Sequence, residues 1–363
     1  MSLELLIAGT MLVSLTFYVL LAGADYGGGV WDLFARGPRA NEQRALIAHA
    51  IGPIWEANHV WMILVIVILF TAFPPAFATI ATALHTPLTL LLIGIVLRGS
   101  AFTFRTYDSQ RDNVQRRWSR VFSIASIITP VILGVIVGAI ASGTIHLAAG
   151  TIAARFIHPW LGPFPFAVGF FALSLFAFLA AVYLTLETRD RELQDDFRLR
   201  ALVSGLAVGV LALIVFLLAG TYAPMIRAGI SASPWAIPLQ VATAMCALGA
   251  LGALWKRSYR VARLFSAGQA TLILWGWALA QYPFIVEPNV SLYSAAAPRE
   301  TLRLLLIALS AGALVLFPSF YYLFRVFKGQ TAFASLTSMA SSGGVENNEL
   351  LDKKHRNSKT LSF

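Results

Sequence analysis

The chain has 363 residues, of which 58% are hydrophobic and only 12% are charged, and its formal net charge is +10. A soluble domain is roughly half apolar and about a quarter charged. The composition therefore excludes an ordinary soluble protein and indicates a multi-pass membrane protein, whose basic loops orient the chain and contact lipid headgroups rather than nucleic acid.

A helix needs roughly 20 apolar residues to cross the hydrocarbon core of a bilayer. The sequence predicts an all-α membrane fold with about nine such helices, arranged as two four-helix bundles plus one peripheral helix. They are expected at residues 5–24, 54–74, 79–101, 121–141, 164–186, 201–219, 236–255, 264–284 and 303–325. The first lacks a preceding basic segment and a cleavage site, so we expect it to be retained.

Two features complete the predicted organisation. The prolines of "FPPAF" predict a tight hairpin between the second and third helices. The membrane domain is expected to cover residues 1–328, and residues 329–363 are polar and rich in serine and asparagine. That last segment is typical of a disordered cytoplasmic tail.

The distribution of basic residues predicts the orientation. Lys and Arg gather in alternate connections, at residues 26–53, 102–120, 187–200 and 256–263, and at the C-terminal end. The other connections hold only Arg155, Arg227, Arg299 and Arg303. Since cytoplasmic loops carry the excess of Lys and Arg, the N-terminus is predicted outside and the C-terminus in the cytoplasm of a bacterial plasma membrane.

Three ionisable residues fall within or at the ends of predicted spans: Asp25, Glu56 and Arg98. Such residues are costly in lipid and usually face a bundle interior or a polar cavity. The alternation of helix direction places all three toward the cytoplasmic side, where Arg98 could pair with one of the acids. The alternative is that each simply anchors a helix end at the interface.

The stretch "IGPIWEANHVW" adds a second signal. Glu56 and His59 are three residues apart on a helix and share a face, whereas Asn58 points elsewhere. A buried Glu–His pair suits proton transfer because burial favours the uncharged forms of both side chains. An interfacial hydrogen-bonded pair is the plainer alternative.

Cofactor signals are weak. The single cysteine, Cys246, lies in an apolar run. One cysteine allows neither a disulfide framework within the chain nor a CxxC haem-attachment motif. His49 and His85 fall at loop or helix-end positions, where axial haem ligation is an open alternative that no CxxCH motif or helical His pair supports. The Gly27–Gly29 run permits a sharp turn or a close backbone approach and lacks the spacing of a phosphate loop.

Four stretches together resemble subunit II of the cytochrome bd-type quinol oxidases: "GADYGGGVWDLF", "IGPIWEANHVWMILVIVILFTAFPPAFA", "LRGSAFTFR" and "QYPFIVEPNVSLYSAAAPRETLRLLLI". The fourth stretch resembles the cyanide-insensitive branch of that family. The resemblance covers residues 5–328 in order and spacing, and leaves the tail outside.

The resemblance implies a heterodimer in the inner membrane that oxidises quinol and reduces oxygen to water in a respiratory chain. Two b-type haems and one d-type haem are then expected in the partner, subunit I, as is the quinol-oxidising loop. This chain would be a haem-free subunit with no complete active site, contributing to proton uptake from the cytoplasm. A small accessory subunit and a structural quinone or lipid are left open.

Residue by residue, Asp25 matches the acid of the family's first-helix motif, and Trp55, Glu56 and Asn58 match its W-D/E-x-N motif. Arg98 matches the arginine of the third-helix motif.

Two positions depart from the pattern. His59 stands where a glutamate or glutamine is usual, and Thr103 where an acid is usual. We therefore expect a proton path through Asp25, Glu56, His59 and Thr103, supported by Arg98, Asn58 and Trp55. The alternatives are a purely structural assembly subunit and, less favoured, a secondary transporter.

Overall fold

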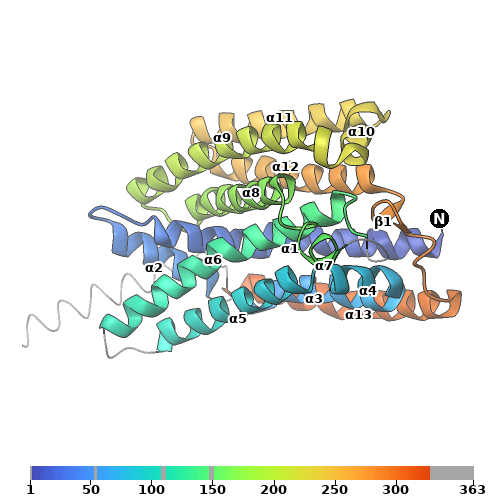
Figure 1. Cartoon of the computed structure of the whole chain (residues 1–363). Coiled ribbons are helices and arrows are strands. Elements are labelled where there is room, and N and C mark those ends of the chain that lie inside the picture. The colour runs from blue at the N-terminus through green and yellow to red at the C-terminus, as the bar shows by residue number, and fades with distance from the viewer. Residues whose placement is uncertain (1, 53–54, 108–111, 147–150, 328–363) are drawn as a thin grey trace, which may run out of the picture. The chain divides into compact units, whose positions relative to one another are not determined.

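The computed structural model describes all residues except 1, 53–54, 108–111, 147–150 and 328–363. The described residues form helices and one two-stranded hairpin (Figure 1). The helices are α1 Leu3–Leu33, α2 Ala40–Ile51, α3 Trp55–Ala72, α4 Pro74–Ala83, α5 His85–Tyr107, α6 Asp112–Ala141, α7 Ile152–Phe156, α8 Pro163–Glu187, α9 Arg191–Tyr222, α10 Pro224–Ala232, α11 Ala236–Trp255, α12 Tyr259–Gln281 and α13 Arg299–Phe327. The hairpin pairs β1 Phe284–Val286 with β2 Val290–Ser291 in antiparallel fashion.

Among the described residues, 8 helices are long and apolar enough to cross a membrane: α1, α3, α5, α6, α8, α9, α11 and α13. They coincide with eight of the nine predicted spans, so the all-α membrane fold is confirmed. The remaining prediction, residues 264–284, falls on α12, whose first two turns contain Arg260 and Arg263 and which is not among these eight helices. Its 23 residues are about 34 Å long, enough to span, and the number of spans stays a prediction.

The proline-rich connection differs from the predicted tight hairpin. Pro74 and Pro75 open the ten-residue helix α4, and α5 begins only at His85. Proline suits the first turn of a helix because its missing N–H would have no intrahelical partner there. The two prolines therefore start a short helix between the two spans instead of making a turn.

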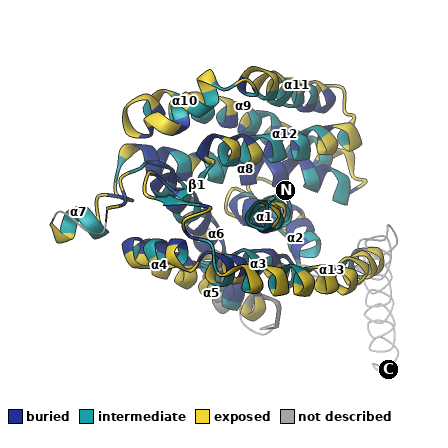
Figure 2. Ribbon diagram, turned by 90° about the vertical axis from the view of Figure 1, so that its right-hand side faces the viewer, coloured by how far each residue is buried: buried dark blue, intermediate teal, exposed yellow. Residues whose placement is uncertain are grey.

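Helix α8 lies at the centre of the packing, against α1, α6, α9 and α12 (Figure 1). Its stretch from Leu175 to Ala181 is buried throughout, and Phe178 and Leu179 join the main apolar cluster with Val208 of α9 and Leu254 of α11. Such a helix is apolar on all sides because protein surrounds it. Figure 2 shows α8 among the more deeply buried segments.

Small residues let the central helices approach closely. A Cβ at Gly134 of α6 would lie 2.7 Å from the Cα atom of Gly169 on α8, and one at Gly27 of α1 would overlap the Phe176 carbonyl of α8. Close backbone packing through small residues is how membrane helices associate without a hydrophobic driving force. The glycine run of α1 therefore serves close approach, and the chain there is helical rather than turned.

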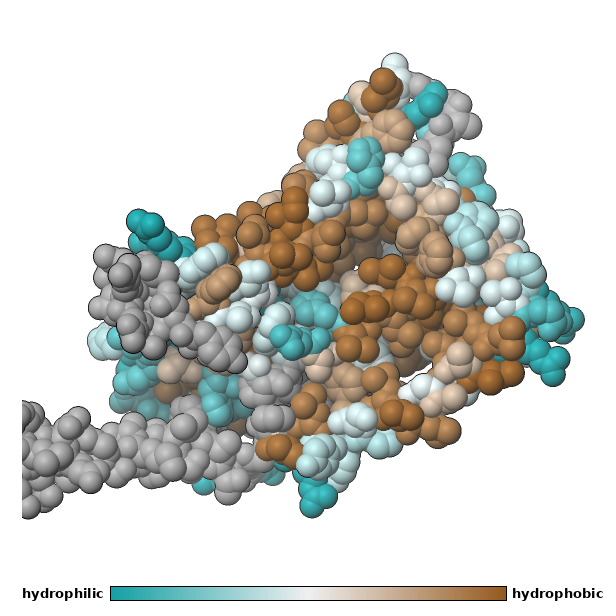
Figure 3. Space-filling model, turned by 90° about the horizontal axis from the view of Figure 1, so that it is seen from below, coloured by the Kyte–Doolittle hydropathy of each residue, from teal (hydrophilic) through white to brown (hydrophobic). Residues whose placement is uncertain are grey.

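The outside of the bundle is apolar. Exposed side chains on α3 and α5 include Ile63, Phe70 and Leu92, which are 59%, 60% and 61% exposed. Figure 3 shows hydrophobic side chains spread broadly over one face. Exposure on this scale suits contact with lipid or another membrane chain rather than water.

Residues Met1–Ala308 form one compact unit and Leu309–Phe363 a second, and the division falls inside α13. Of the second unit, the structure describes the helical residues 309–327, which include Pro318. The predicted polar tail, residues 329–363, lies outside the described residues.

Candidate functional site: a buried polar cluster on α1

Asp25 and Asn58 form the centre of the candidate site. Asp25 is on α1 and 5% exposed, and Asn58 is on α3 and fully buried. The Asn58 amide Nδ2 donates a hydrogen bond of 2.5 Å to Oδ2 of Asp25. The amide oxygen of Asn58 has no hydrogen-bond partner among the described residues. A carboxylate is therefore held inside an apolar bundle, with an unused acceptor beside it.

Arg98 of α5 is the largest of the fully buried side chains that the structure describes, at 1% exposed. Its Nε donates to the Ser126 hydroxyl of α6 at 3.2 Å. Its guanidinium carbon lies 4.7 Å from the ring centre of Tyr26 and 5.2 Å from that of Phe122. These cation–π contacts partly replace the water that a buried charge loses. Nη2 of Arg98 has no partner within the described part of the chain.

Two buried tyrosines continue the cluster along α1. The Tyr18 hydroxyl donates to the Tyr26 hydroxyl at 3.4 Å across two helical turns. The half-buried ring of His59 lies 6.0 Å from the Tyr18 ring and 6.1 Å from the Tyr26 ring, centre to centre. His59 is therefore surrounded by aromatic rings, including Trp55 at 6.3 Å.

A second acid of α1, Asp32, belongs to the same buried region and was not singled out from the sequence. It is 2% exposed and accepts a hydrogen bond of 2.9 Å from the Ser123 hydroxyl of α6. Asp25 and Asp32 are seven residues apart, which places them on one face two turns from each other. That spacing within "ADYGGGVWD" is the signal that could have identified Asp32 from sequence.

The expected site residues separate into two groups. Asp25, Asn58, His59 and Arg98 all contact groups in or around the cluster on α1. Glu56 and Thr103 have exposed side chains, and the Thr103 hydroxyl donates to the Gly99 carbonyl of its own helix at 3.1 Å. Trp55 packs against Phe102 and covers Gly99.

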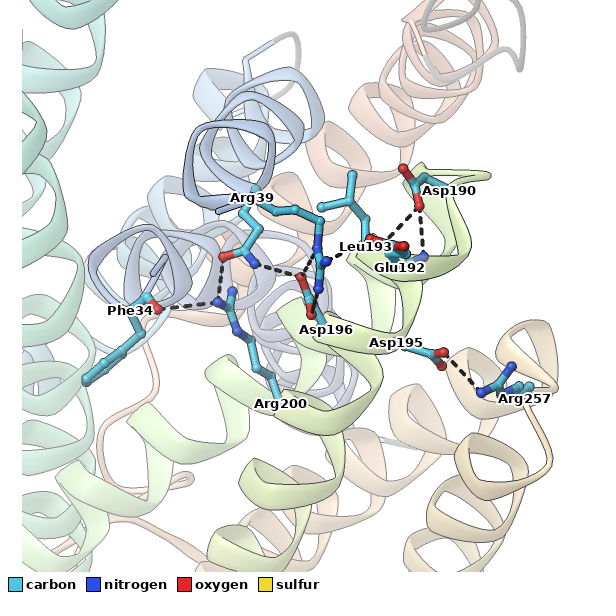
Figure 4. A network of polar contacts seen from close by, with 10 residues as sticks. Phe34, Arg39, Asp190, Glu192, Leu193, Asp195, Asp196, Arg200 and Arg257 are labelled. Carbon is cyan, nitrogen blue, oxygen red and sulfur yellow. Dashed lines mark hydrogen bonds and ion pairs between the residues drawn. The ribbon is translucent and has the colours of Figure 1, made fainter. Parts of the chain in front are cut away.

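A separate polar network joins the start of α9 to the start of α2 (Figure 4). The Arg39 guanidinium binds both oxygens of Asp196, at 3.0 and 2.8 Å, and Glu192 at 2.7 Å. Gln43 donates to Asp196 at 2.8 Å and accepts from Arg200 at 2.7 Å. The hydrogen bond to Asp196 raises the pKa of Arg39. This network ties helix ends together at the edge of the bundle.

A metal centre finds no support among the described residues, which contain no group of three or more His, Cys, Asp or Glu side chains suited to hold an ion. His49 lies on α2 and His85 at the start of α5, where its Nδ1 is 3.0 Å from the Thr82 carbonyl oxygen.

The fold and the site define a class: a polytopic helical membrane protein that holds buried charged groups between α1, α3, α5 and α6. Comparison with known proteins makes the class specific. The family model for cytochrome bd terminal oxidase subunit II matches residues 3–327. The chain belongs to this family, and hence to the subunits of a membrane-bound oxidoreductase complex that also contains a subunit I.

Individual relatives agree with this family assignment. A putative cytochrome bd menaquinol oxidase subunit II of Bacillus subtilis is 22% identical over 338 residues, 90% of this chain and 96% of the relative. Subunit 2 of a cytochrome bd ubiquinol oxidase from the same organism is 35% identical over 130 residues, 35% of this chain and 37% of the relative. Subunit 2 of the Escherichia coli cytochrome bd-I ubiquinol oxidase is 23% identical over 220 residues, 60% of this chain and 55% of the relative.

The structure of the bd oxidase from Geobacillus thermodenitrificans matches with a TM-score of 0.72 and 19% identity, covering 90% of this chain and 99% of that one. The predicted family, the all-α membrane fold and the oxidoreductase complex are thus confirmed.

Proposed function

We propose that this chain pairs with the haem-bearing subunit I of a quinol oxidase and, without binding haem itself, carries protons from the cytoplasm toward the site of oxygen reduction. Reduction of oxygen to water consumes protons, which must cross an apolar bundle to reach a buried haem. The observation that supports the proposal is Asp25, held by Asn58 inside the membrane near the cation of Arg98. Ionisable groups in such positions commonly mark proton relays.

The proposed orientation has the N-terminus outside, so α1 ends on the cytoplasmic side. Two of the arginine-rich connections, which contain Arg39 and Arg200, then lie in the cytoplasm. Reporter fusions after Ile157 and Ser291 should behave as external, and fusions after Asn113 and Glu192 as cytoplasmic. The opposite pattern would overturn this orientation.

The test replaces Asp25 by Asn in the complete oxidase. This change keeps the shape and the hydrogen bond to Asn58 but removes the titrating proton. We expect normal haem content with quinol-oxidase turnover lowered about tenfold or more. The exposed cytoplasmic acid Glu42, changed to Gln, is the control and should leave turnover unchanged.

Glu56→Gln is the companion variant. Glu56 is exposed in this chain, on a helix whose apolar side chains are also exposed. If Glu56 contributes to the path at the contact with subunit I, turnover falls while haem content holds. Full turnover in both Asp25→Asn and Glu56→Gln would exclude the proton path.

A structural role is the second candidate, favoured by the packing of Arg98 between Tyr26, Phe122 and Ser126. In that case Asp25→Asn would weaken the cluster and the complex would lose haem in proportion to turnover. Expression of the chain alone provides a further check, because a stoichiometric haem spectrum would contradict the assignment of all haems to subunit I.

A further inference from the structure

One face of α1 carries a row of buried polar side chains: Ser14, Tyr18, Asp25 and Asp32, which are 2%, 1%, 5% and 2% exposed. Their spacings of four, seven and seven residues keep them on one side of the helix. From residue 14 to residue 32 the helix rises about 27 Å, close to the roughly 30 Å hydrocarbon thickness of a bilayer. A single helix thus places buried polar side chains across a distance close to the thickness of the hydrocarbon core.

Helix α6 presents a matching row toward α1 and α5. Ser123, Ser126 and Thr129 are spaced three residues apart and are 2%, 0% and 1% exposed. Ser123 donates to Asp32 and Ser126 accepts from Arg98. Gly29 of α1 leaves room for Ser126, because a Cβ there would overlap its hydroxyl oxygen. The two rows therefore meet at the level of Arg98.

Three buried polar atoms of this region have no hydrogen-bond partner among the residues the structure describes: Nη2 of Arg98, Oδ1 of Asn58 and Oγ1 of Thr129. Buried donors and acceptors of this kind usually bind internal water, which needs several polar partners. The three atoms lie on α5, α3 and α6, which contact Tyr26, Asp25 and Asp32 of α1, respectively. They are suited to hold water between the two acids.

We propose that Asp32 is the group of this chain that takes up the proton on the cytoplasmic side. It passes the proton through the hydroxyls of Ser123 and Ser126 and water bound at Arg98 to Asp25, two helical turns deeper. Each carboxylate gains and then releases one proton, and each hydroxyl accepts one proton as it gives up another, so no electrons move and no group is consumed. This inference rests on the proposed proton-carrying function of the chain.

Position supports the assignment. Asp32 is the next-to-last residue of α1, which ends at Leu33, so in the proposed orientation it is the acid of α1 nearest the cytoplasm. It is linked to α6 by a hydroxyl that can both donate and accept. If Asp32 only anchored α6, it would need the hydrogen bond to Ser123 but not a titrating proton. Anchoring and proton uptake therefore predict different results for a variant that keeps the hydrogen bond and cannot titrate.

The experiment uses the complete oxidase in liposomes and compares Asp32→Asn, Asp32→Glu, Ser123→Ala and Asp25→Asn, with Glu42→Gln as the control. Haem content, quinol-oxidase turnover and its pH profile, and the rate of electrogenic proton uptake are measured. We expect Asp32→Asn to keep its haems and to slow uptake about tenfold or more. Asp32→Glu should restore uptake, and Ser123→Ala should slow it less than Asp32→Asn.

The outcomes separate this inference from the function on which it rests. Slow uptake in Asp25→Asn with normal uptake in Asp32→Asn overturns the role of Asp32 and leaves the proton path intact. Normal uptake in both variants overturns the path itself. Loss of haem in proportion to turnover in both Asp32→Asn and Ser123→Ala assigns the pair to anchoring and also overturns the inference. If the Asp32→Asn complex does not assemble, the Ser123→Ala complex with its full haem content decides. Slowed proton uptake in Ser123→Ala supports the inference, and normal uptake in that variant overturns it.

Discussion

Two arginines of this chain show how differently a polar network is built inside and outside the membrane. Arg39 binds three oxygens of two carboxylates, and its side chain is 35% exposed. Arg98 is 1% exposed, and it contacts one serine hydroxyl and two aromatic rings. The exposed network is rich in partners yet weakly stabilising, because water and salt screen it. Water does not screen the contacts of the buried arginine, so each of them matters more.

The largest expected effect comes from removing the buried arginine. Arg98→Ala should lower the free energy of unfolding by about 2–5 kcal/mol, since it empties the space of a fully buried side chain and leaves Ser126 without its donor. The measurement is the temperature at which the purified complex loses helical circular dichroism. Arg39→Ala is the matched control and should lower that temperature much less. Equal shifts in the two variants would remove the contrast between the networks.

A buried acid outside the candidate membrane-spanning helices gives the second prediction. Glu287, in the loop after β1, is 2% exposed, and its Oε1 has no hydrogen-bond partner among the described residues. Burial raises its pKa to about 7 from the usual 4.5. The folded loop therefore binds the proton more tightly than the unfolded loop. Its stability is greatest below pH 4.5 and is lost as pH rises toward 7, by on the order of 3 kcal/mol.

Limited proteolysis of the 282–298 segment at several pH values measures this effect. Cleavage should accelerate between pH 5 and pH 7 in the unmodified chain. Glu287→Gln should show no such acceleration, because it does not titrate, and it also corrects for the pH dependence of the protease. The same acceleration in both proteins would contradict the burial of a titrating acid.

The packing that holds Asp25 in place gives the third prediction. Gly27→Ala should lower the free energy of unfolding by about 1–3 kcal/mol, because the new methyl group overlaps the Phe176 carbonyl of α8. Gly9→Ala on the same helix has nothing within 4 Å of the added carbon and should be neutral or slightly stabilising. Thermal unfolding of both complexes provides the comparison, and an equally stable Gly27→Ala protein would exclude close α1–α8 contact there.

The smallest effect is expected in the exposed network. Asp196→Asn removes the charge that Arg39 binds with two hydrogen bonds and should cost no more than about 1 kcal/mol. The loss should shrink as salt is raised, because the pair lies at the surface. Unfolding temperatures at low and high salt test this. A large, salt-independent loss would show that the network is as shielded as the cluster around Arg98.

Many individual residues of the site could be identified from the sequence, but the contacts between them could not. A lone arginine or acid in an apolar stretch is visible because its cost in lipid is high, and Asp25, Glu56 and Arg98 were singled out for that reason. The partners of these groups lie on other helices. That Arg98 pairs with an acid stays a prediction, and its contacts with Ser126, Tyr26 and Phe122 could not be named from the sequence. Serines and tyrosines are too common in such helices to signal a contact by themselves.

By itself the sequence determined the all-α membrane class, the positions of eight spans and the family, because apolar length and the spacing of rare motifs are local properties of the chain. Only the tertiary structure decided which face of each helix is inside. It brought Asp32 to Ser123 and Asn58 to Asp25, and left Glu56 and Thr103 exposed. The reason is that helix rotation is set by packing between helices, here through Gly27 and Gly29 of α1 against Phe176 and Ser126. Such contacts join residues far apart in the chain.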